Sequence, residues 1–586
     1  MIVYGDHARV LLPREELQAL RERLRRLGRW RGAPPIERHG ALVAAFLRAA
    51  QLAQGLIDQR FEEHGRQDAA DPLVDACHGA LLILARAVVH SFEAGLRWPG
   101  GADPSALDAL LRCALPERIT CRQPEGFAFY AAYPEAWAAA AKRIGAREVR
   151  CVGIRTIGTA LAPMVQASVR GMRPIVTVRP VGHPYARTIC VEESLADAFT
   201  RGGPGVVWAI ADEGPGRSGS SFAAVCRWLG AHGVPCERIH LLPSHDHGPG
   251  PEATDEVRAI WSGTRRHVVT FDELFLAGDS PLPLTRWFED LIGLVERFDD
   301  LSAGAWRAVL CGDAASWPPA HPFQERRKFL LQSERGTWLA RFCGLGDAGA
   351  EAFARARAVA DAGFAPPVIA ERHGFSLERW ETDARPLADA PPSRRALIHR
   401  VGAYLGFRAR RFPAETTRGA PLTALFQMAR FNAQTALGDD AARAIASFEP
   451  ALGELASDLR RVNTDNRLHA WEWLVTKDGR ILKTDGADHC RGHDLIGSQD
   501  IAWDLAGAEV ELALTGEEMR RLIATAVDHG ARRPSQRLLD FYRLAYPAFW
   551  LGHFQLALEA TADERERRRL CAQVDRYARV LRRYVP

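Results

Sequence analysis

The sequence lacks paired cysteines. Its 11 cysteines among 586 residues stand singly, and no Cys-x-x-Cys pair occurs. Zinc ribbons need such pairs, and small disulfide scaffolds need a much higher cysteine density. Neither class is therefore indicated, and we expect most of these thiols to be small buried side chains.

The chain also has little net charge and no recognisable targeting segment. The first six residues, Met1 to Asp6, have neither the charged start nor the apolar core of a signal peptide, and no apolar run approaches the length of a membrane span. The formal net charge is +4, and the arginines are scattered, so nucleic-acid binding is not indicated. We expect a cytoplasmic protein that does not bind membranes.

The chain does have length and an ordinary globular composition. At 586 residues, 47% hydrophobic and 25% charged, it should divide into about three or four units. Helical periodicity predicts a helical N-terminal region over residues 1–118. Apolar strands near 150, 175, 208, 240 and 269 predict an α/β domain with a doubly wound parallel sheet over 119–275. A connector over 276–323 and a last domain over 324–586 complete the division.

The stretch that carries the clearest chemistry begins with the apolar run Val206–Ala211, which is typical of a strand buried on both faces. Asp212 and Glu213 end this run, and a loop of glycines and hydroxyls then leads into a helical pattern. Such a loop lets backbone amides approach an anion, and the helix N-terminus adds a partial positive charge. Phosphate is the expected ligand, and the two carboxylates could hold hydroxyls or a bridging Mg²⁺.

This stretch resembles the signature of type I phosphoribosyltransferases. The resemblance implies that Asp212 and Glu213 contact the ribose hydroxyls of phosphoribosyl pyrophosphate, and that the loop holds its 5′-phosphate. The loop candidates are Gly214, Gly216, Arg217, Ser218, Gly219, Ser220 and Ser221. The loop is one residue longer than usual, and the alternative is a glycine-rich turn of some other α/β domain.

Two further strand ends collect candidate ligands. Phosphoribosyltransferases place a pyrophosphate-binding loop after the strand predicted at 149–154, and the candidates there are Arg155, Thr156, Gly158 and Thr159. A strand predicted at 174–178 runs into a segment rich in cations, where Arg179, His183 and Arg187 could bind pyrophosphate or the acceptor, because open α/β sheets bind ligands at the carboxyl ends of their strands. The alternatives are a tight turn that needs glycine and ordinary surface charges.

The pattern changes after residue 324. A hairpin over 326–342, a helix over 348–362 and strands at 367–370 and 374–378 resemble the small lobe of kinase-like phosphotransferases, such as aminoglycoside phosphotransferases and choline kinases. In that family a strand lysine binds the nucleotide phosphates and pairs with a helix glutamate. Arg341 stands where the lysine would be, with Glu351 as its candidate partner, and both are nucleotide-binding candidates.

A second polar stretch follows between residues 463 and 506. The same resemblance makes Asp465 the base or substrate-positioning group, Asp485 or Asp488 the magnesium ligand, and Asp504 the structural anchor of the catalytic loop. The His-Gly-Asp signature is missing, and Glu472 stands where a metal-binding asparagine is expected. Independently, several carboxylates at strand ends are costly to cluster without cations, which favours Mg²⁺ with a phosphorylated ligand. Exposed turns are the alternative.

These patterns together predict a bifunctional transferase that ends in a bilobal α+β kinase-like domain. It would act with Mg²⁺ on phosphoribosyl pyrophosphate and on ATP or a related nucleotide, with an acceptor that the sequence does not identify. One alternative is a nucleotide-sensing regulatory protein that binds without turnover. Another is an active kinase whose first part is a ligand-binding module, because fold alone does not fix function.

Overall fold

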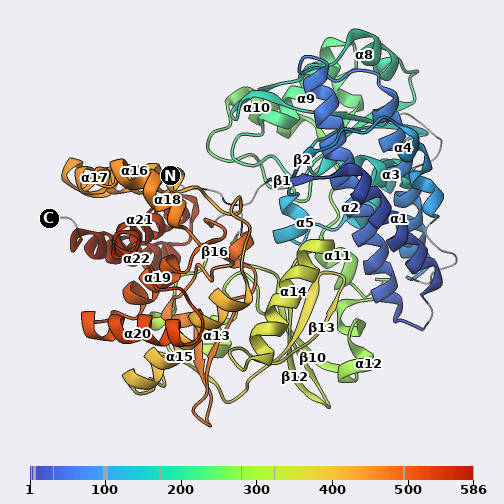
Figure 1. Ribbon diagram of the computed structural model, residues 1–586. Coiled ribbons are helices and arrows are strands. Elements are labelled where there is room, and N and C mark those ends of the chain that lie inside the picture. Colours follow the sequence, from blue (N-terminus) through green and yellow to red (C-terminus); the bar gives the residue numbers. More distant parts are fainter. Residues whose placement is uncertain are drawn as a thin grey trace.

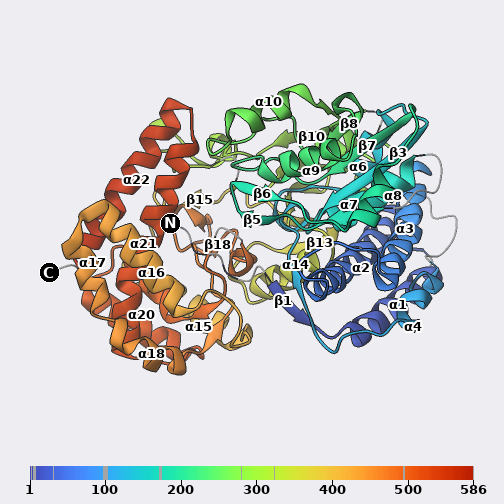
Figure 2. The same cartoon turned by 90° about the horizontal axis from the view of Figure 1, so that it is seen from above.

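The computed structural model describes residues 1–586 except 2, 4, 6–7, 31, 97–102, 170–174, 279, 322–323, 493–494 and 585–586. It is a mixed α/β structure with many helices and several sheets, as predicted. Figure 1 shows the N-terminal helices in blue and the C-terminal helices in orange and red on opposite sides, with the yellow antiparallel sheet between them. The turned view in Figure 2 keeps this arrangement.

The N-terminal region is helical, as the periodicity predicts. Leu17, Leu20, Leu24 and Leu27 form the buried stripe of the first helix. The region also contains a strand, β1, which pairs antiparallel with β2 at the start of the next region. The elements are β1 (Ala8–Leu11), α1 (Pro13–Arg29), α2 (Pro35–Glu63), α3 (Pro72–Glu93), α4 (Asp108–Arg112) and β2 (Ile119–Arg122).

Helices α2 and α3 correct one expectation from the sequence. Both are long and apolar enough to cross a membrane, whereas no apolar run was expected to approach that length. Their most apolar 18-residue windows are 78% and 50% buried within the chain, respectively. Core helices of soluble proteins pass the same test, so these two helices are weak evidence for a membrane span.

A five-stranded parallel sheet follows in the order β4-β3-β7-β8-β9. Alternate residues of β7 enter two different cores: Ala209 packs in the core that contains α7, and Trp208 in the core that contains α8 and α9. Helices therefore cover both faces. The elements are α5 (Glu125–Phe129), α6 (Pro134–Lys142), β3 (Glu148–Ile154), α7 (Gly158–Ser168), β4 (Val176–Val178), β5 (Val181–His183), β6 (Ala186–Thr188), α8 (Glu193–Thr200), β7 (Val206–Ala211), α9 (Ser220–Ala231), β8 (Ile239–Leu242), α10 (Asp255–Gly263) and β9 (Arg265–Arg266).

The edges of this sheet differ from the prediction in two places. The last strand was predicted near residue 269, but β9 ends at Arg266, and Thr270 caps helix α11 (Phe271–Phe275) in a capping box with Glu273. The cap fixes the backbone of Thr270 as a helix start, which ends the extended segment. Of the strand predicted at 174–178, residue 174 lies outside the described residues, and Val176–Val178 form β4.

The predicted connector over 276–323 contributes to the next sheet. Its strand β10 (Val295–Asp300) is the edge of an antiparallel sheet in the order β10-β11-β12-β14-β13. The other elements are α12 (Glu289–Ile292), α13 (Arg307–Leu310), β11 (Lys328–Ser333), β12 (Gly336–Phe342), α14 (Gly346–Asp361), β13 (Val368–Arg372) and β14 (Phe375–Arg379). Phe329, Phe342 and Phe375 share one core with α2 and α6, so this sheet packs directly on the N-terminal part of the chain.

The remaining chain is mostly helical and has its own core, as the periodicity predicts. Two small sheets, β15-β17-β18 and β16-β19, belong to this part of the chain. The elements are β15 (Arg385–Pro386), α15 (Arg394–Arg411), α16 (Leu422–Leu437), α17 (Asp439–Ala446), α18 (Leu452–Asp458), β16 (Arg461–Val462), β17 (Trp473–Val475), β18 (Ile481–Lys483), β19 (Gln499–Asp500), α19 (Ala502–Glu511), α20 (Gly516–Asp528), α21 (Gln536–Ala560) and α22 (Glu564–Arg582).

Candidate functional site

The two carboxylates at the end of β7 lie where the sequence predicts them. The backbone N–H of Gly126 in α5 donates to Oε2 of Glu213 at 3.0 Å, and the backbone N–H of Glu213 donates to Oδ1 of Asp212 at 2.8 Å. Burial raises the pKa of Asp212 to about 7. Burial, helped by the nearby Glu125 and Asp212, raises the pKa of Glu213 to about 8. Both groups therefore hold protons near neutral pH unless a cation or a hydroxyl ligand stabilises the charged form.

The loop after these carboxylates leads into the N-terminus of helix α9. Its N-cap residue is Gly219, which has no side chain to cap the helix, and the backbone N–H of Ser220 donates to Oγ of Ser218 at 3.3 Å. Ser218 and Ser220 donate from Oγ to the carbonyl of Pro184 in the β5–β6 turn, at 3.2 and 2.8 Å. Arg217 is exposed and donates from Nε to Glu252 at 3.0 Å. The hairpin β5–β6 thus lies against the predicted phosphate loop.

Gly219 is the residue of this loop with the least room. Its φ is +66°, and an added Cβ would lie 2.8 Å from Cγ1 of Val257 and 3.0 Å from Cβ of Pro249. Gly219→Ala should therefore destabilise the protein by about 1–3 kcal/mol, measured by urea unfolding. Gly216 is the matched control, because its φ is +55° but no described heavy atom lies within 4 Å of an added Cβ. Gly216→Ala should cost only the backbone strain, and an equal or larger loss there would contradict this account.

The cations predicted to bind pyrophosphate are already paired inside the chain. Arg155 donates from Nε to Oδ1 of Asp58 at 2.9 Å and from Nη1 to Oδ1 of Asp68 at 2.6 Å. Arg179 donates from Nε to the same Oδ1 of Asp58 at 2.9 Å. Both carboxylates lie in or just after α2, in a region to which the sequence assigned no chemistry. A phosphate ligand would have to compete with them.

The other candidates near these strand ends have structural or exposed positions. An added Cβ on Gly158 would lie 2.7 Å from the carbonyl carbon of Gly153, so the tight-turn alternative describes Gly158. Thr156 accepts from Nη1 of Arg179 at 3.4 Å, and Thr159 is fully buried behind it. His183 is exposed on the β5–β6 hairpin. Arg187, on the same hairpin, donates to the carbonyl of Gly182 at 2.7 Å.

In the second half of the chain, Arg341 on β12 pairs with a different glutamate from the one predicted. It donates to Oε1 of Glu378 on β14 from Nε at 3.1 Å and from Nη2 at 2.8 Å, and Nη1 donates to Asp485. Glu351 instead pairs with Arg491 and, at 3.9 Å, with Arg355. Strands β12 and β14 are neighbours, and Glu378 lies two residues beyond Ser376, which is paired with Arg341, so the two side chains can meet diagonally across the strands.

The predicted metal ligands do cluster, but the chain supplies its own cations to them. Lys483 donates to Glu472 at 2.6 Å and lies 3.5 Å from Asp465. His489 lies between Asp465, at 3.3 Å from Oδ1, and Asp485, at 3.7 Å from Oδ2. Lys483 and His489 offset much of the negative charge of these carboxylates, so the cluster does not by itself require Mg²⁺.

The pKa values of this cluster follow from that pairing. Burial opposes the charged form of Asp485, but Arg341 and His489 hold its pKa well below the usual range. Burial also opposes protonated His489, yet its contacts with Asp465 and Asp485 raise its pKa to about 9. Burial raises the pKa of Glu472 despite Lys483. At neutral pH His489 is thus a cation between two carboxylates.

Asp504 has the anchoring role that the resemblance implied. Its two carboxylate oxygens accept hydrogen bonds from the backbone amides of Asp465, at 2.7 Å, and Asn466, at 2.9 Å. Tyr404 and Arg408 of α15 close the other side, since Tyr404 donates to Oδ2 of Asp465 and Arg408 donates to the carbonyl of Asn463. The side chain of Asp465 is 0% exposed. The predicted catalytic carboxylate is therefore held rigidly, but away from solvent.

Arg341, Glu472, Asp485 and Asp488 line a cavity of about 210 Å³ between the antiparallel sheet and the C-terminal helices. Aromatic side chains, which the sequence analysis did not single out, form much of the remaining wall: Trp306, Trp380, His469, Trp471, Trp550 and Phe554. Such a cavity can hold a planar or cationic group against the rings and phosphates near the charged side chains.

The short helix α5 connects the two candidate sites. Besides the amide of Gly126 that donates to Glu213, the carbonyl of Phe127 accepts from the N–H of Leu345, just before α14, at 2.8 Å. The carbonyl of Ala128 accepts from Nη1 of Arg326 at 2.6 Å. Arg326 also pairs through Nη2 with Oδ2 of Asp488 at 2.7 Å. One five-residue helix therefore contacts a carboxylate of the first site and an arginine of the second.

No family model matches the chain, and no curated protein sequence matches it. Several solved structures of phosphotransferases are similar to part of it. The choline kinase LicA from Streptococcus pneumoniae is 14% identical over 43% of this chain and 89% of its own, with a TM-score of 0.29. A choline/ethanolamine kinase family protein from Mesorhizobium loti is 18% identical over 44% and 90%, with a TM-score of 0.29.

Spectinomycin phosphotransferase APH(9)-Ia, solved with ADP and spectinomycin, is 11% identical over 51% of this chain and 97% of its own, with a TM-score of 0.33. These TM-scores lie below 0.5, so the function proposed below is argued from the chain's own geometry. The similarity to phosphoribosyltransferases stays a prediction. Kinase-like phosphotransferases are thus what about half of the chain is similar to.

Proposed function

We propose that the cavity is the nucleotide site of a kinase-type phosphotransferase. The observation that carries this proposal is the pairing of Arg341 with Asp485 and Asp488 in the lining of a cavity that aromatic rings also line. Phosphoryl transfer needs cations for the phosphates, carboxylates for a magnesium ion and a cavity that limits water. Arg341 provides the cation, Asp485 and Asp488 provide the carboxylates, and the cavity limits the access of water.

The carboxylates also fit a magnesium ion. The buried carboxylate of Asp488 pairs with Arg326, whose Nη2 lies 2.7 Å from Oδ2, and Nη1 of Arg341 lies 4.0 Å from Oδ1. Within the described part of the chain neither contact has hydrogen-bond geometry, so both oxygens could still bind a cation. Asp485 and Asp488 would hold the ion, which would offset the charge of the nucleotide phosphates. Arg341, displaced from Asp485, would turn to the phosphates while Glu378 keeps it in place. Asp465 would keep Lys483 and His489 in position, and its role as a base stays a prediction.

The test is to titrate the full-length protein with ATP, with and without Mg²⁺, and to follow ADP release. Binding that depends on Mg²⁺ and is followed by ADP release would support the kinase-type function. We expect Mg²⁺ to strengthen ATP binding at least about tenfold, because the paired carboxylates otherwise repel the phosphates. Equal binding with and without Mg²⁺, and no ADP, would contradict the proposal.

That second outcome would favour the alternative, a protein that senses a nucleotide without turnover. The specific observation for it is that internal cations already occupy the carboxylates and that Asp465 is fully buried. A site of this kind can bind phosphates through Arg341 but offers no exposed base to an acceptor hydroxyl. The two functions therefore differ in one measurement, the release of ADP.

For the first site we propose binding of a phosphorylated ribose such as phosphoribosyl pyrophosphate, with transfer to an acceptor that is not identified. The support is the pair of carboxylates at the end of β7 and the glycine- and serine-containing loop that leads from them to the N-terminus of α9. The hydroxyls of Ser218 and Ser220, now donated to Pro184, would be available to a phosphate when the β5–β6 hairpin moves aside. The pairing of Arg155 and Arg179 with α2 leaves the pyrophosphate end of this site the less supported part.

Asp212→Asn with Glu213→Gln should abolish binding of phosphoribosyl pyrophosphate and raise stability at pH 8. The pKa values of these two carboxyls are higher in the folded state than those of exposed carboxyls, so the folded state favours the protonated groups. Their contribution to the free energy of unfolding is therefore present at low pH and is lost as pH rises through about 7 to 8. The double variant has no carboxyls to ionise at these positions. After allowance for partial exposure, its free energy of unfolding at pH 8 should exceed that of the wild type by about 1–2 kcal/mol. Calorimetry and urea unfolding at pH 5 and pH 8 measure both effects. Retained binding, or a lower stability at pH 8 than the wild type, would contradict the assignment.

A further inference from the structure

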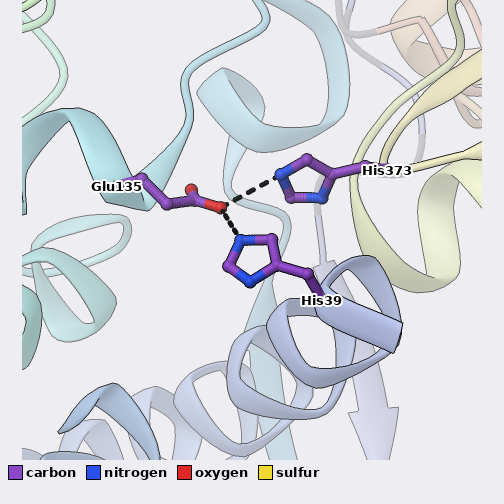
Figure 3. Close-up of side chains that lie close together, drawn as sticks. All are labelled: His39, Glu135 and His373. Atoms are coloured by element: carbon purple, nitrogen blue, oxygen red, sulfur yellow. Dashed lines mark hydrogen bonds and ion pairs between the residues drawn. The ribbon is translucent and has the colours of Figure 1, made fainter. Parts of the chain in front are cut away.

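A buried cluster away from both sites joins three distant parts of the chain. His39 comes from α2, Glu135 from α6, and His373 from the turn between β13 and β14. Figure 3 shows the two imidazole rings pointing at one carboxylate oxygen from different directions. None of the three side chains is exposed. The proposed function uses none of them.

The three ligand atoms converge closely. Nε2 of His39 lies 2.8 Å and Nε2 of His373 lies 3.0 Å from Oε1 of Glu135. In addition, Nδ1 of His39 lies 3.0 Å from Oγ of Ser91. When Nδ1 donates to that hydroxyl, the lone pair of Nε2 is left facing the centre of the cluster, which is how a second partner orients a metal-binding histidine.

Hydrogen bonds inside the chain leave this cluster incomplete. Among the described residues, neither Oε2 of Glu135 nor either ring nitrogen of His373 makes a hydrogen bond, although Nε2 of His373 lies 3.0 Å from Oε1 of Glu135. Aromatic rings surround the cluster: those of Tyr133 and Trp287 lie 4.9 and 5.5 Å from the ring of His373. A carboxylate buried in such a shell is costly unless a cation lies beside it.

The backbone at this point is also held in an unusual conformation. His373 has a φ of +47°, in the left-handed region that few residues other than glycine adopt. Its carbonyl accepts a hydrogen bond from the hydroxyl of Tyr133 at 2.7 Å. Strained residues of this kind persist where the surroundings fix them, often at binding sites. The fold thus places the imidazole of His373 at the cluster at a cost in backbone energy.

We propose that His39, Glu135 and His373 bind a structural transition-metal ion of the Zn²⁺ class. Two imidazole nitrogens and a carboxylate oxygen are a donor set that zinc takes in proteins, with bonds of about 2.0–2.2 Å. Neighbouring donor atoms around such an ion lie about 3.3 Å apart, so the observed separations need to open by only a few tenths of an ångström. The unpartnered Oε2 of Glu135 or a water can complete the coordination. Bound there, the ion ties α2, α6 and the β13–β14 turn together.

The test measures metal in the full-length protein. Wild type is loaded with Zn²⁺, dialysed against a weak chelator and analysed for zinc by mass spectrometry; we expect about one equivalent per chain to remain. Glu135→Gln keeps the shape of the side chain but removes its charge. This variant and His373→Ala should each retain at least about tenfold less zinc per chain than the wild type. His267→Asn is the control, because His267 belongs to another histidine pair, partly buried, with its Nε2 3.0 Å from Nδ1 of His240.

A second control separates this cluster from the carboxylates of the cavity. Asp485→Asn should retain the zinc, and loss of zinc there but not in Glu135→Gln would place the metal in the cavity and overturn the proposal. If the cluster variants do not fold, wild type loaded with Co²⁺ decides, since nitrogen ligands give intense visible absorption bands that a hexa-aquo ion lacks. No retained zinc and no such bands would mean that the two imidazoles simply pair with Glu135 and would overturn the proposal. Neither result depends on whether the protein binds ATP.

Discussion

Asp485→Asn should weaken Mg²⁺-dependent ATP binding by about 100-fold or more and remove ADP release. The substitution keeps the size of the side chain but removes a charged oxygen that would bind the metal, and loss of even an outer partner typically costs about 10–100-fold in metal affinity. Arg341 would keep its bonds to Glu378, so the fold should be retained. Titration calorimetry with and without Mg²⁺ measures the effect.

The control for this result is Asp478→Asn in the turn between β17 and β18. Asp478 is exposed and pairs with Arg480 at 2.8 Å, away from the cavity lining. Asp478→Asn changes the net charge by the same amount as Asp485→Asn, and Asp485 lies two residues after β18. Equal losses of ATP binding in the two variants would show that the net charge matters and that Asp485 is not a metal ligand.

Asp504→Ala should lower the free energy of unfolding by about 3–5 kcal/mol. The substitution leaves the buried amides of Asp465 and Asn466 without acceptors, each costing about 1–3 kcal/mol, and it also leaves a cavity. Asp504→Asn should cost less, because its carbonyl can still accept from one amide. Urea unfolding measures the difference. Near-equal stability of Asp504→Ala and wild type would contradict an anchoring role for Asp504. The exposed Asp528→Ala, at the end of α20, should change stability by less than about 0.5 kcal/mol.

Local patterns predicted local structure well. The apolar run Val206–Ala211 is strand β7 with the same bounds, since a continuous run of β-favouring residues between turn signals has few other conformations open to it. The leucine stripe of α1 is buried as its spacing predicts. The resemblance to kinase-like phosphotransferases also implied an anchoring role for Asp504, and its carboxylate accepts from the backbone amides of Asp465 and Asn466.

Long-range partners could not be predicted in the same way. Periodicity identified α2 as a helix with a buried face, but not that Asp58 on it would pair with Arg155, 97 residues away. The predicted partner of Arg341 was a helix glutamate, whereas strand pairing places Glu378 beside it. The predicted boundaries between domains are blurred for the same reason, because α2, α6 and β12 contribute to one core whose members are far apart in the sequence.

The bonds made by α5 have a thermodynamic consequence for ligands at the two sites. Helix α5 holds Glu213 at one end and Arg326, the partner of Asp488, at the other. A ligand that changes the position of Glu213 therefore acts on the same five residues that position Arg326. By linkage, any factor by which a ligand at β7 changes nucleotide affinity in the cavity is the factor by which the nucleotide changes the affinity at β7. Affinities of the two ligands measured separately would then not describe the protein when both are present.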